Sequence, residues 1–278
     1  MYARARPSYP EEVVEKVVKS PSSNEPLNIV ELGAGTGIAT KVIIEACSGP
    51  SAHARLASYT ALDASSAMME ALERSLMQAP DGLVPRLKQS GLLGADVTTD
   101  TGVATFEDFN SAQRFTGQVD LILIAQAWHW CQDWDKALCN FAKALKPGGT
   151  LALLWNLEDK DAAPWVRNAR EEFEKYEGDF PQYRHFGWHA MYKQPGFAHF
   201  EVLPEVHLTR SLPTTIEGVC SRVRSKSYIS VLPDDQWSQV EAKIKAFLRA
   251  PDAGISWIDE DKGIFEYPYK TALHLFRR

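Results

Sequence analysis

The segment VELGAGTGIAT, residues 30–40, has three glycines at alternate positions directly after a run of apolar residues. They are Gly33, Gly35 and Gly37. Glycine adopts left-handed backbone conformations without strain and has no Cβ, so a loop of this kind turns tightly and lets a ligand approach its backbone. The pattern predicts a ligand-binding loop between a buried strand and a helix.

The spacing of these glycines bears on which nucleotide-like ligand the loop would bind. The dinucleotide fingerprint G-x-G-x-x-G needs its third glycine at position 38, but that residue is Ile38 and the glycine comes one residue early. Asp63 ends the next predicted strand, where a carboxylate can accept hydrogen bonds from both ribose hydroxyls. Enzymes that bind NAD also have an acid at this point, so Asp63 by itself does not decide the ligand.

Further motifs accompany the loop. The chain contains E-x-G-x-G-x-G at 31–37, AQAWHW at 125–130, LKPGGTLAL at 145–153, RPSYP at 6–10, SRVRSKSYISVL at 221–232 and PYKTALHLFRR at 268–278. Together they resemble class I S-adenosylmethionine-dependent methyltransferases, in particular the trans-aconitate methyltransferase-like enzymes and their fungal small-molecule relatives. The resemblance implies S-adenosylmethionine as cofactor and methyl transfer to a small-molecule acceptor, with a carboxylate favoured.

The resemblance also implies roles for individual residues. The glycine loop would line the methionine and ribose part of the cofactor, and Asp63 would hold the ribose. Val103 stands where the family has an acid, so adenine would be recognised by backbone groups or by another carboxylate such as Asp100. RPSYP matches an N-terminal lid segment. The cofactor-binding residues expected from the resemblance are Tyr2, Arg6, Tyr9, Glu31, Gly33, Ala34, Gly35, Gly37, Asp63, Ala64, Met68, Val103, Ala104, Gln126 and Ala127.

The chemistry of S-adenosylmethionine determines what the acceptor site must do. The cofactor is a sulfonium, and its methyl group is already activated for transfer. The protein then has to align the acceptor and exclude water, so no metal site and no protein nucleophile are expected. A base is needed only if the acceptor must lose a proton. His129, at the carboxyl edge of the predicted sheet, is the candidate base, and a loop-orienting role for it is equally open. The residues expected to contact the acceptor are Trp128, Trp130, Trp155, Arg222, Arg224 and Lys226.

The scaffold for these residues follows from hydrophobic periodicity. Residues 27–156 alternate short apolar runs with amphipathic stretches, which predicts an α/β fold with a doubly wound, mostly parallel seven-stranded sheet and an elaborated C-terminal half. Residues 119–125 are apolar except for Asp120, as is typical of a central parallel strand.

Some local expectations are more specific. The helix over 37–46 is expected to bury Ile38, Val42, Ile43 and Ala46. Residues 79–100 read as an irregular insertion with a strand near its end. The helix over 133–149 is expected to stop at Pro147 and the two glycines that follow.

No long linker interrupts the chain, so one methyltransferase domain over 1–278 is expected. Its parts would be a lid and helix at 1–26, a cofactor core at 27–156 and a substrate side at 157–278. A net charge of −6 disfavours a nucleic-acid partner, and no apolar run is long enough for a membrane helix. The N-terminus lacks the apolar stretch of a secretory signal, which favours a cytoplasmic location. The oligomeric state is not indicated.

Two other functions remain open at this stage. An NAD(P)-linked oxidoreductase would have the same general fold, but Ile38 disfavours it. A non-catalytic regulator that binds S-adenosylmethionine would keep the loop and Asp63 without turnover.

Overall fold

A computed structural model describes residues 5–78 and 80–278, which form two compact units interleaved along the chain. The core unit comprises Ser8–Trp155, Pro181–Val206 and Ala272–Arg278. The helical unit comprises residues 5–7, Asn156–Phe180 and His207–Thr271. Tyr2, an expected cofactor contact, lies outside the described residues. The single domain over 1–278 stays a prediction.

The core unit is built on a mostly parallel sheet. Across it the strands follow the order β3-β2-β1-β4-β5-β9-β6. The pairs β1–β2, β1–β4, β2–β3 and β4–β5 are parallel, and β6–β9 is antiparallel. The strands are β1 (Leu27–Leu32), β2 (Leu56–Asp63), β3 (Thr98–Val103), β4 (Val119–Ala125), β5 (Leu145–Glu158), β6 (Glu201–Val202) and β9 (Ile264–Arg277). This order is that of a doubly wound fold and confirms the predicted fold class. Among the described residues β7 (Val206–Thr214) and β8 (Trp257–Asp259) also pair with β9, so the sheet has nine strands where seven were predicted.

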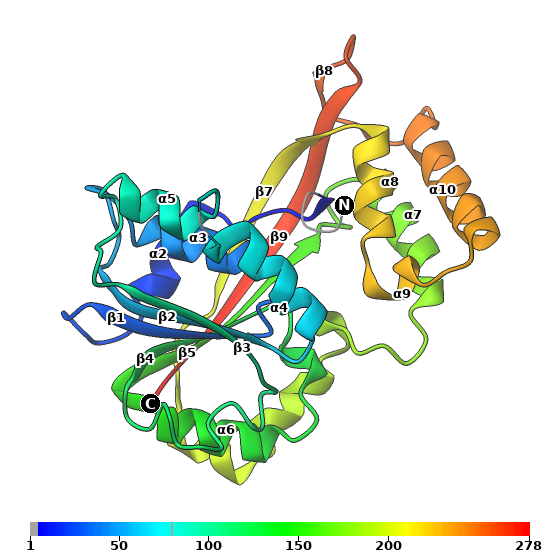
Figure 1. The fold of residues 1–278 in the computed structure, drawn as a ribbon. Helices are drawn as coiled ribbons and strands as arrows, with labels where there is room; N and C mark the ends of the chain where they lie inside the picture. Colours follow the sequence, from blue (N-terminus) through cyan, green and yellow to red (C-terminus); the bar gives the residue numbers. More distant parts are fainter. Residues whose placement is uncertain (1–4, 79) are drawn as a thin grey trace. The chain divides into compact units, whose positions relative to one another are not determined.

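Helices cover both faces of this sheet. Figure 1 shows α3 and α4 on one side of the strands and α6 on the other. Helix α4 begins after Ser65, whose hydroxyl accepts a hydrogen bond from the N–H of Met68, as expected for a cap. The helices of the core unit are α2 (Glu11–Val18), α3 (Ile38–Ala46), α4 (Ser66–Leu72), α5 (Leu83–Gln89) and α6 (Trp134–Ala144), with short turns η1 (Glu73–Met77), η2 (Trp128–Trp130), η4 (Tyr183–His185), η5 (Gly187–Lys193) and η6 (Pro195–His199).

Helix α3 buries a different face from the one expected. Ile43 is buried as predicted, but Ile38, Val42 and Ala46 are only half-buried. The hydroxyl of Thr40 donates a hydrogen bond to the buried carboxyl of Glu31, 2.5 Å away, which turns the Thr40 side of the helix inward. The expectation failed because a polar side chain faces the core. The buried residues are Ala39, Thr40, Ile43 and Ile44.

The end of one helix and the presence of another also differ from the expectation. Helix α6 ends at Ala144, because Leu145 already pairs with Val119 in the sheet, so Pro147 lies within β5 and does not stop the helix. The segment expected to be irregular contains α5, which has Pro85 in its first turn, where proline is tolerated.

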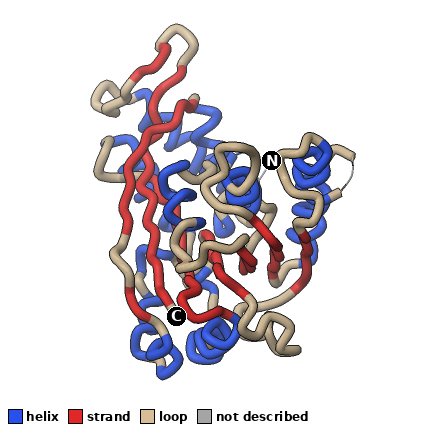
Figure 2. Tube along the Cα trace, turned by 90° about the vertical axis from the view of Figure 1, so that its left-hand side faces the viewer, coloured by secondary structure: helices blue, strands red, loops and turns tan. Residues whose placement is uncertain are grey.

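The helical unit has a hydrophobic core of its own. Figure 1 shows α7, α8, α9 and α10 gathered together. Trp165 of α7 packs edge-on against Phe265 of β9, with ring centroids 5.7 Å apart. The β8–β9 hairpin projects past these helices (Figures 1 and 2). The elements are α7 (Pro164–Phe173), η3 (Glu174–Tyr176), β7 (Val206–Thr214), α8 (Ile216–Arg224), α9 (Ser227–Ser230), α10 (Asp234–Arg249) and β8 (Trp257–Asp259). Within 5–78 and 80–278, no helix combines the length and the apolar character needed to span a bilayer.

Candidate functional site

The glycine loop after β1 needs its three glycines for two different reasons. All three have positive φ, at +70°, +57° and +85° for Gly33, Gly35 and Gly37. A Cβ on Gly33 would lie 2.5 Å from the Cβ of Ala127, and a Cβ on Gly37 would lie 2.5 Å from Leu76. A Cβ on Gly35 would meet no heavy atom of the described residues within 4 Å. Contact within the protein therefore explains Gly33 and Gly37, whereas Gly35 presents bare backbone on an open side.

Asp63 connects the end of β2 to this loop. Its Oδ2 accepts a hydrogen bond from the N–H of Gly35 at 2.9 Å, and its Oδ1 accepts one from the N–H of Ser65 at 2.8 Å. The parallel register pairs Leu32 with Leu62, which brings the two strand ends together. Each carboxylate oxygen can accept a second hydrogen bond, and Asp63 is only half-buried. The residue can therefore hold the loop and still accept hydrogen bonds from two ligand hydroxyls.

Glu31, at the end of β1, is turned toward the core. Its Oε2 accepts hydrogen bonds from the hydroxyls of Thr40 at 2.5 Å and Tyr59 at 2.7 Å. Burial raises the pKa of the Glu31 carboxyl to about 7. These contacts fix the end of β1 directly before the glycine loop. Direct contact of Glu31 with a ligand stays a prediction.

The residues after β3 present little side-chain chemistry. Val103 is 61% exposed, and the N–H of Ala104 donates to the backbone carbonyl of Asp63 at 3.1 Å. Asp100, the alternative acid for adenine, pairs with Arg114 at 2.5 Å. On the other side of Asp63, Ala64 is exposed and Met68 is half-buried. The N–H of Ala104 and the carboxylate of Asp100 are thus both engaged within the protein, and adenine recognition at this point stays a prediction.

The loop after β4 has an unusual backbone. Gln126 has a φ of +60°, a conformation that non-glycine residues rarely adopt and that often occurs at functional sites. Its N–H donates to the carbonyl of Leu154 in β5 at 2.8 Å. The next residue, Ala127, is the one that approaches Gly33. The carboxyl ends of β1 and β4 therefore meet the Leu154 region of β5 at this loop.

The two tryptophans of AQAWHW have different environments. Trp128 is fully buried, packs edge-on against Phe106 at 5.6 Å and directs its indole N–H to the sulfur of Met191 at 2.9 Å. Trp130 is 39% exposed. Of the two, Trp130 is the one whose ring can reach a ligand without rearrangement.

His129 lies between them and contacts β5. The indole N–H of Trp155 donates to Nδ1 of His129 at 3.3 Å. Burial, together with the nearby His185, lowers the pKa of His129 to about 4. The imidazole is therefore neutral near pH 7. Trp155 is fully buried, so it acts on a ligand through His129 if at all.

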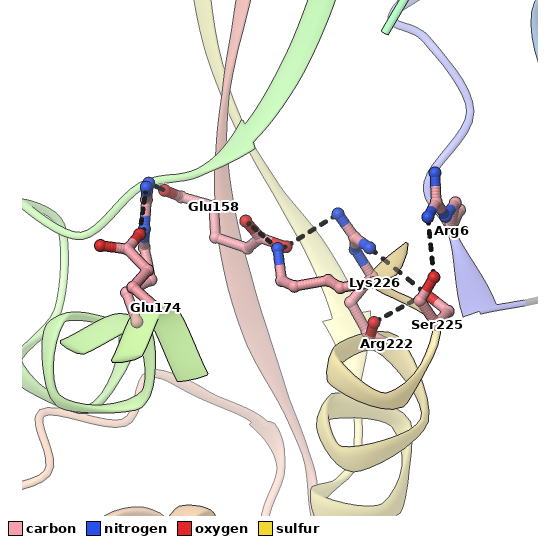
Figure 3. A network of polar contacts seen from close by, with 7 residues as sticks. Arg6, Glu158, Glu174, Arg222, Ser225 and Lys226 are labelled. Carbon is pink, nitrogen blue, oxygen red and sulfur yellow. Dashed lines mark hydrogen bonds and ion pairs between the residues drawn. The ribbon is translucent and has the colours of Figure 1, made fainter. Parts of the chain in front are cut away.

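The predicted acceptor-binding cations Arg222 and Lys226 belong to the helical unit and converge on Glu158, as Figure 3 shows. A guanidinium nitrogen of Arg222 lies 2.8 Å from Oε1 of Glu158, and Nζ of Lys226 lies 2.9 and 3.1 Å from the two carboxylate oxygens. Arg170 donates to the backbone carbonyl of Glu158 at 2.9 Å.

The pKa values of Glu158 and Lys226 are both lowered in this cluster, for different reasons. Although burial opposes it, the charges of Arg222 and Lys226 hold the pKa of Glu158 well below its usual range. Burial lowers the pKa of Lys226 to about 7, against the attraction of Glu158. Arg222 remains charged, and its Nε is buried without a hydrogen-bond partner among the described residues. Arg222 and Lys226 are thus both paired with one buried carboxylate, and Arg170 pairs with Glu174 at 2.6 Å.

The remaining predicted residues are engaged elsewhere. Arg224 donates to the carbonyls of Ile229 at 2.9 Å and Leu232 at 3.3 Å. Arg6, in the helical unit, donates to the carbonyl of Ser225 at 2.7 Å (Figure 3). Tyr9 belongs to the core unit and is buried.

Sequence reasoning missed residues that the structure brings to these clusters. Glu158 stands two residues after the predicted strand ends, and an acid just past a buried strand was the available signal. Tyr183 and Trp188 stack against Trp155 at 4.6 and 5.0 Å, but they come from an aromatic segment without periodicity. No local pattern indicated that contact.

A parallel sheet in this strand order, with a glycine loop after β1 and an acid ending β2, defines a Rossmann-like protein for a nucleoside-containing cofactor. The family described as "Methyltransferase domain" matches residues 30–151. An uncharacterized methyltransferase-like protein of Schizosaccharomyces pombe is 26% identical over 87% of this chain and 81% of its own length. An uncharacterized methyltransferase of Mycobacterium tuberculosis is 32% identical over 61% of this chain and 54% of its own length.

Among solved structures, a protein from Anaeromyxobacter dehalogenans assigned as a type II methyltransferase has a TM-score of 0.60. The match has 16% identity and covers 98% of this chain and 97% of that one, so it bears on the fold. The protein is a methyltransferase enzyme with the class I, Rossmann-like fold. The open side of Gly35 and the remaining acceptor capacity of Asp63 fit S-adenosylmethionine, the cofactor expected from the sequence. The narrower trans-aconitate-like group stays a prediction.

Proposed function

We propose that this methyltransferase binds S-adenosylmethionine at the glycine loop of the core unit and transfers its methyl group to a small-molecule carboxylate. The observation that supports the cofactor site is the hydrogen bond between Asp63 and the N–H of Gly35, 2.9 Å long. It places a carboxylate with spare acceptor capacity beside a glycine that is open to ligand.

Each part of the loop region has a proposed role. Asp63 accepts hydrogen bonds from the ribose hydroxyls, and the bare backbone at Gly35 lets the methionine part approach. The N–H and C=O groups near Val103 and Ala104, with Met68, border the adenine. Gln126 and Ala127 meet the amino-acid end. Arg6 and Tyr9 belong to the proposed lid segment.

For methyl transfer the protein mainly has to position the acceptor relative to the methyl group. When bound, S-adenosylmethionine supplies a methyl group that is already activated by the positive sulfur. The residues of this chain then have to hold the acceptor in line and exclude water, and alignment alone is worth effective molarities of about 10⁵–10⁸ M in favourable cases. A carboxylate acceptor is already ionised near pH 7, so no residue has to remove a proton.

Substitution of Asp63 tests the cofactor site. We expect Asp63→Ala to weaken S-adenosylmethionine binding by roughly ten- to a hundred-fold, the loss of a hydrogen bond to a charged group worth about 1.5–3 kcal/mol. Calorimetric titration with S-adenosylmethionine and, separately, with NAD measures this. Asp108→Ala is the control, because Asp108 is exposed and pairs with Lys136. An unchanged dissociation constant in Asp63→Ala would rule out the ribose role.

A carboxylate is the acceptor class that the sequence resemblance favours. Arg222 and Lys226, paired with Glu158 in the helical unit, stay predicted acceptor contacts. A screen of mono-, di- and tricarboxylates with methyl-labelled cofactor is the direct test. A carboxylate acceptor predicts a single-turnover rate that is flat with pH near neutrality. A hydroxyl or amine acceptor predicts a rate that rises with pH through a pKa that His129→Ala removes, with His129 contributing about 10²–10⁴ in rate as a base.

A further inference from the structure

His129 and Trp155 form an imidazole–indole pair at the carboxyl ends of β4 and β5. The register pairs Ala125 with Leu154, so the residues that follow these two come side by side. The hydrogen bond from the N–H of Gln126 to the carbonyl of Leu154, 2.8 Å, fixes the start of the His129 loop against β5. Both side chains belong to the core unit, which also contains the glycine loop and Asp63.

The contact between the two rings decides which nitrogen of His129 carries the proton. An indole N–H can only donate, so Nδ1 of His129, 3.3 Å from Nε1 of Trp155, must offer a lone pair. The neutral imidazole then carries its hydrogen on Nε2. Within residues 5–78 and 80–278, no hydrogen bond reaches Nε2, and the ring is only half-buried. Nε2–H is therefore a donor available to a ligand.

Trp155 is held in place by the side chains around it. Its ring lies 4.6 Å from that of Tyr183 and 5.0 Å from that of Trp188, and it is fully buried. The hydroxyl of Tyr183 is 3.2 Å from Nε2 of His274, whose Nδ1 lies 3.1 Å from a carboxylate oxygen of Glu205. A close-packed aromatic stack of this kind leaves the indole N–H little freedom to leave Nδ1.

The charged state of His129 is disfavoured by the same surroundings. An imidazolium would turn Nδ1 into a donor that faces the donor of Trp155. The titratable groups facing the pair are His185, which acts on His129, together with Tyr183 and His274, whose rings lie 4.6 and 5.7 Å from that of Trp155. Burial raises the pKa of Tyr183 to about 12, so its hydroxyl is neutral near pH 7. None of these groups supplies a negative charge near pH 7 to stabilise a cation. His129 is thus poorly suited to take a proton from an acceptor.

We propose that His129 binds the methyl acceptor by donating its Nε2–H to an acceptor oxygen, and that Trp155 is the positioning residue that fixes His129 in this tautomer. The role at the acceptor rests on the proposed function, because it requires an oxygen acceptor that needs no base. The tautomer itself does not depend on that function. No bond is made or broken by either residue in this role.

Nitrogen NMR of the ¹⁵N-labelled full-length protein tests the tautomer without any acceptor. We expect the neutral Nε2–H form of His129 at pH 7, assigned by comparison with His129→Gln. Trp155→Phe should abolish the single tautomer and give a mixture or the Nδ1–H form. Trp188→Phe is the matched control: it is equally buried in the same stack, but its indole N–H donates to the carbonyl of Tyr183 at 3.2 Å. An Nδ1–H tautomer in the wild-type protein, or an imidazolium at pH 7, would overturn the proposal.

Two substitutions at position 129 then test the donor role, with the most active carboxylate from the screen described above. The amide of glutamine occupies the place of Nε2, whereas that of asparagine occupies the place of Nδ1. We expect His129→Gln to keep KM within about threefold of wild type and His129→Asn to raise it about ten- to a hundred-fold, with kcat flat between pH 6 and 8.

The reverse order of the two variants, or a wild-type kcat that rises with pH through a pKa absent from His129→Gln, would refute the donor role. If no carboxylate is methylated, the proposed acceptor class is wrong. The NMR comparison of Trp155→Phe with Trp188→Phe then still decides whether Trp155 fixes the tautomer. Should Trp155→Phe fail to fold, the wild-type spectrum alone decides the tautomer.

Discussion

Asp63 accepts a hydrogen bond from the backbone N–H of Gly35, 2.9 Å away, across 28 positions of sequence. The end of β2 therefore holds the loop that follows β1, and a substitution at either position reports on the same site. Asp63 acts through its carboxylate and Gly35 through the absence of a side chain. One is therefore tested by removing a side chain and the other by adding one.

Replacement of Gly35 by alanine should cost binding as well as stability. Gly117 offers a matched control, because it has a φ of +63° against +57° for Gly35 and neither would bring a new Cβ within 4 Å of a described heavy atom. Both Gly35→Ala and Gly117→Ala should lower the free energy of unfolding by about 1–2 kcal/mol through backbone strain. Calorimetry should show more than tenfold weaker S-adenosylmethionine binding for Gly35→Ala alone. Equal affinities in the two variants would contradict the loop assignment.

Glu31→Gln should stabilise the protein increasingly as the pH rises. The folded-state pKa of Glu31 is raised from 4.5 to about 7, so the folded state binds the proton more tightly than the unfolded state. Between these values the free energy of unfolding falls with pH, and above pH 7 the full cost of burying the ionised carboxyl is present. Urea denaturation at pH 5 and pH 8 should show a gain for Glu31→Gln that is larger at pH 8 by roughly 1–3 kcal/mol. A gain that is independent of pH would mean that Glu31 is not protonated in the fold.

Glu158→Gln should destabilise the protein strongly, because Arg222 and Lys226 would lose their buried counter-charge. We expect a loss of about 3–5 kcal/mol in the free energy of unfolding, measured by chemical denaturation. Asp108→Asn, which affects the exposed pair with Lys136, is the control and should cost about 1 kcal/mol or less. Adding Lys226→Met to Glu158→Gln should restore part of the loss, and the absence of any recovery would argue against excess positive charge as the cause.

Acid should remove the contribution of Glu158. Its pKa is lowered in the fold by the cations around it, so the stabilisation is present above the ordinary pKa of a glutamate and is lost as the pH falls toward the folded-state value. Below about pH 4 the wild-type protein should therefore lose stability faster than Glu158→Gln. Parallel pH dependences of the two proteins in that range would be incompatible with an ionised, paired Glu158.

Local sequence was enough for the glycine loop, for Asp63 and for the strand pattern. Gly33, Gly35 and Gly37 all have positive φ, and glycine at such positions is visible in the local sequence. The contacts with Ala127 and Leu76 that also require Gly33 and Gly37 come from the tertiary structure. The apolar run at 119–125 likewise predicts a strand buried on both faces, because burial acts on every residue of such a strand.

Side-chain partners that come from distant segments were decided only by the tertiary structure. Lys226 meets Glu158 across 68 positions, and Trp155 meets His129 and Tyr183 from three separate stretches of chain. Periodicity records which face of an element is apolar, but the choice among partners depends on close packing of non-local side chains and on the desolvation of their charges. For that reason the sequence by itself determined a cofactor loop on a parallel sheet. Only the fold determined that two of the expected acceptor-binding cations neutralise Glu158, and that Trp155 occupies Nδ1 of His129.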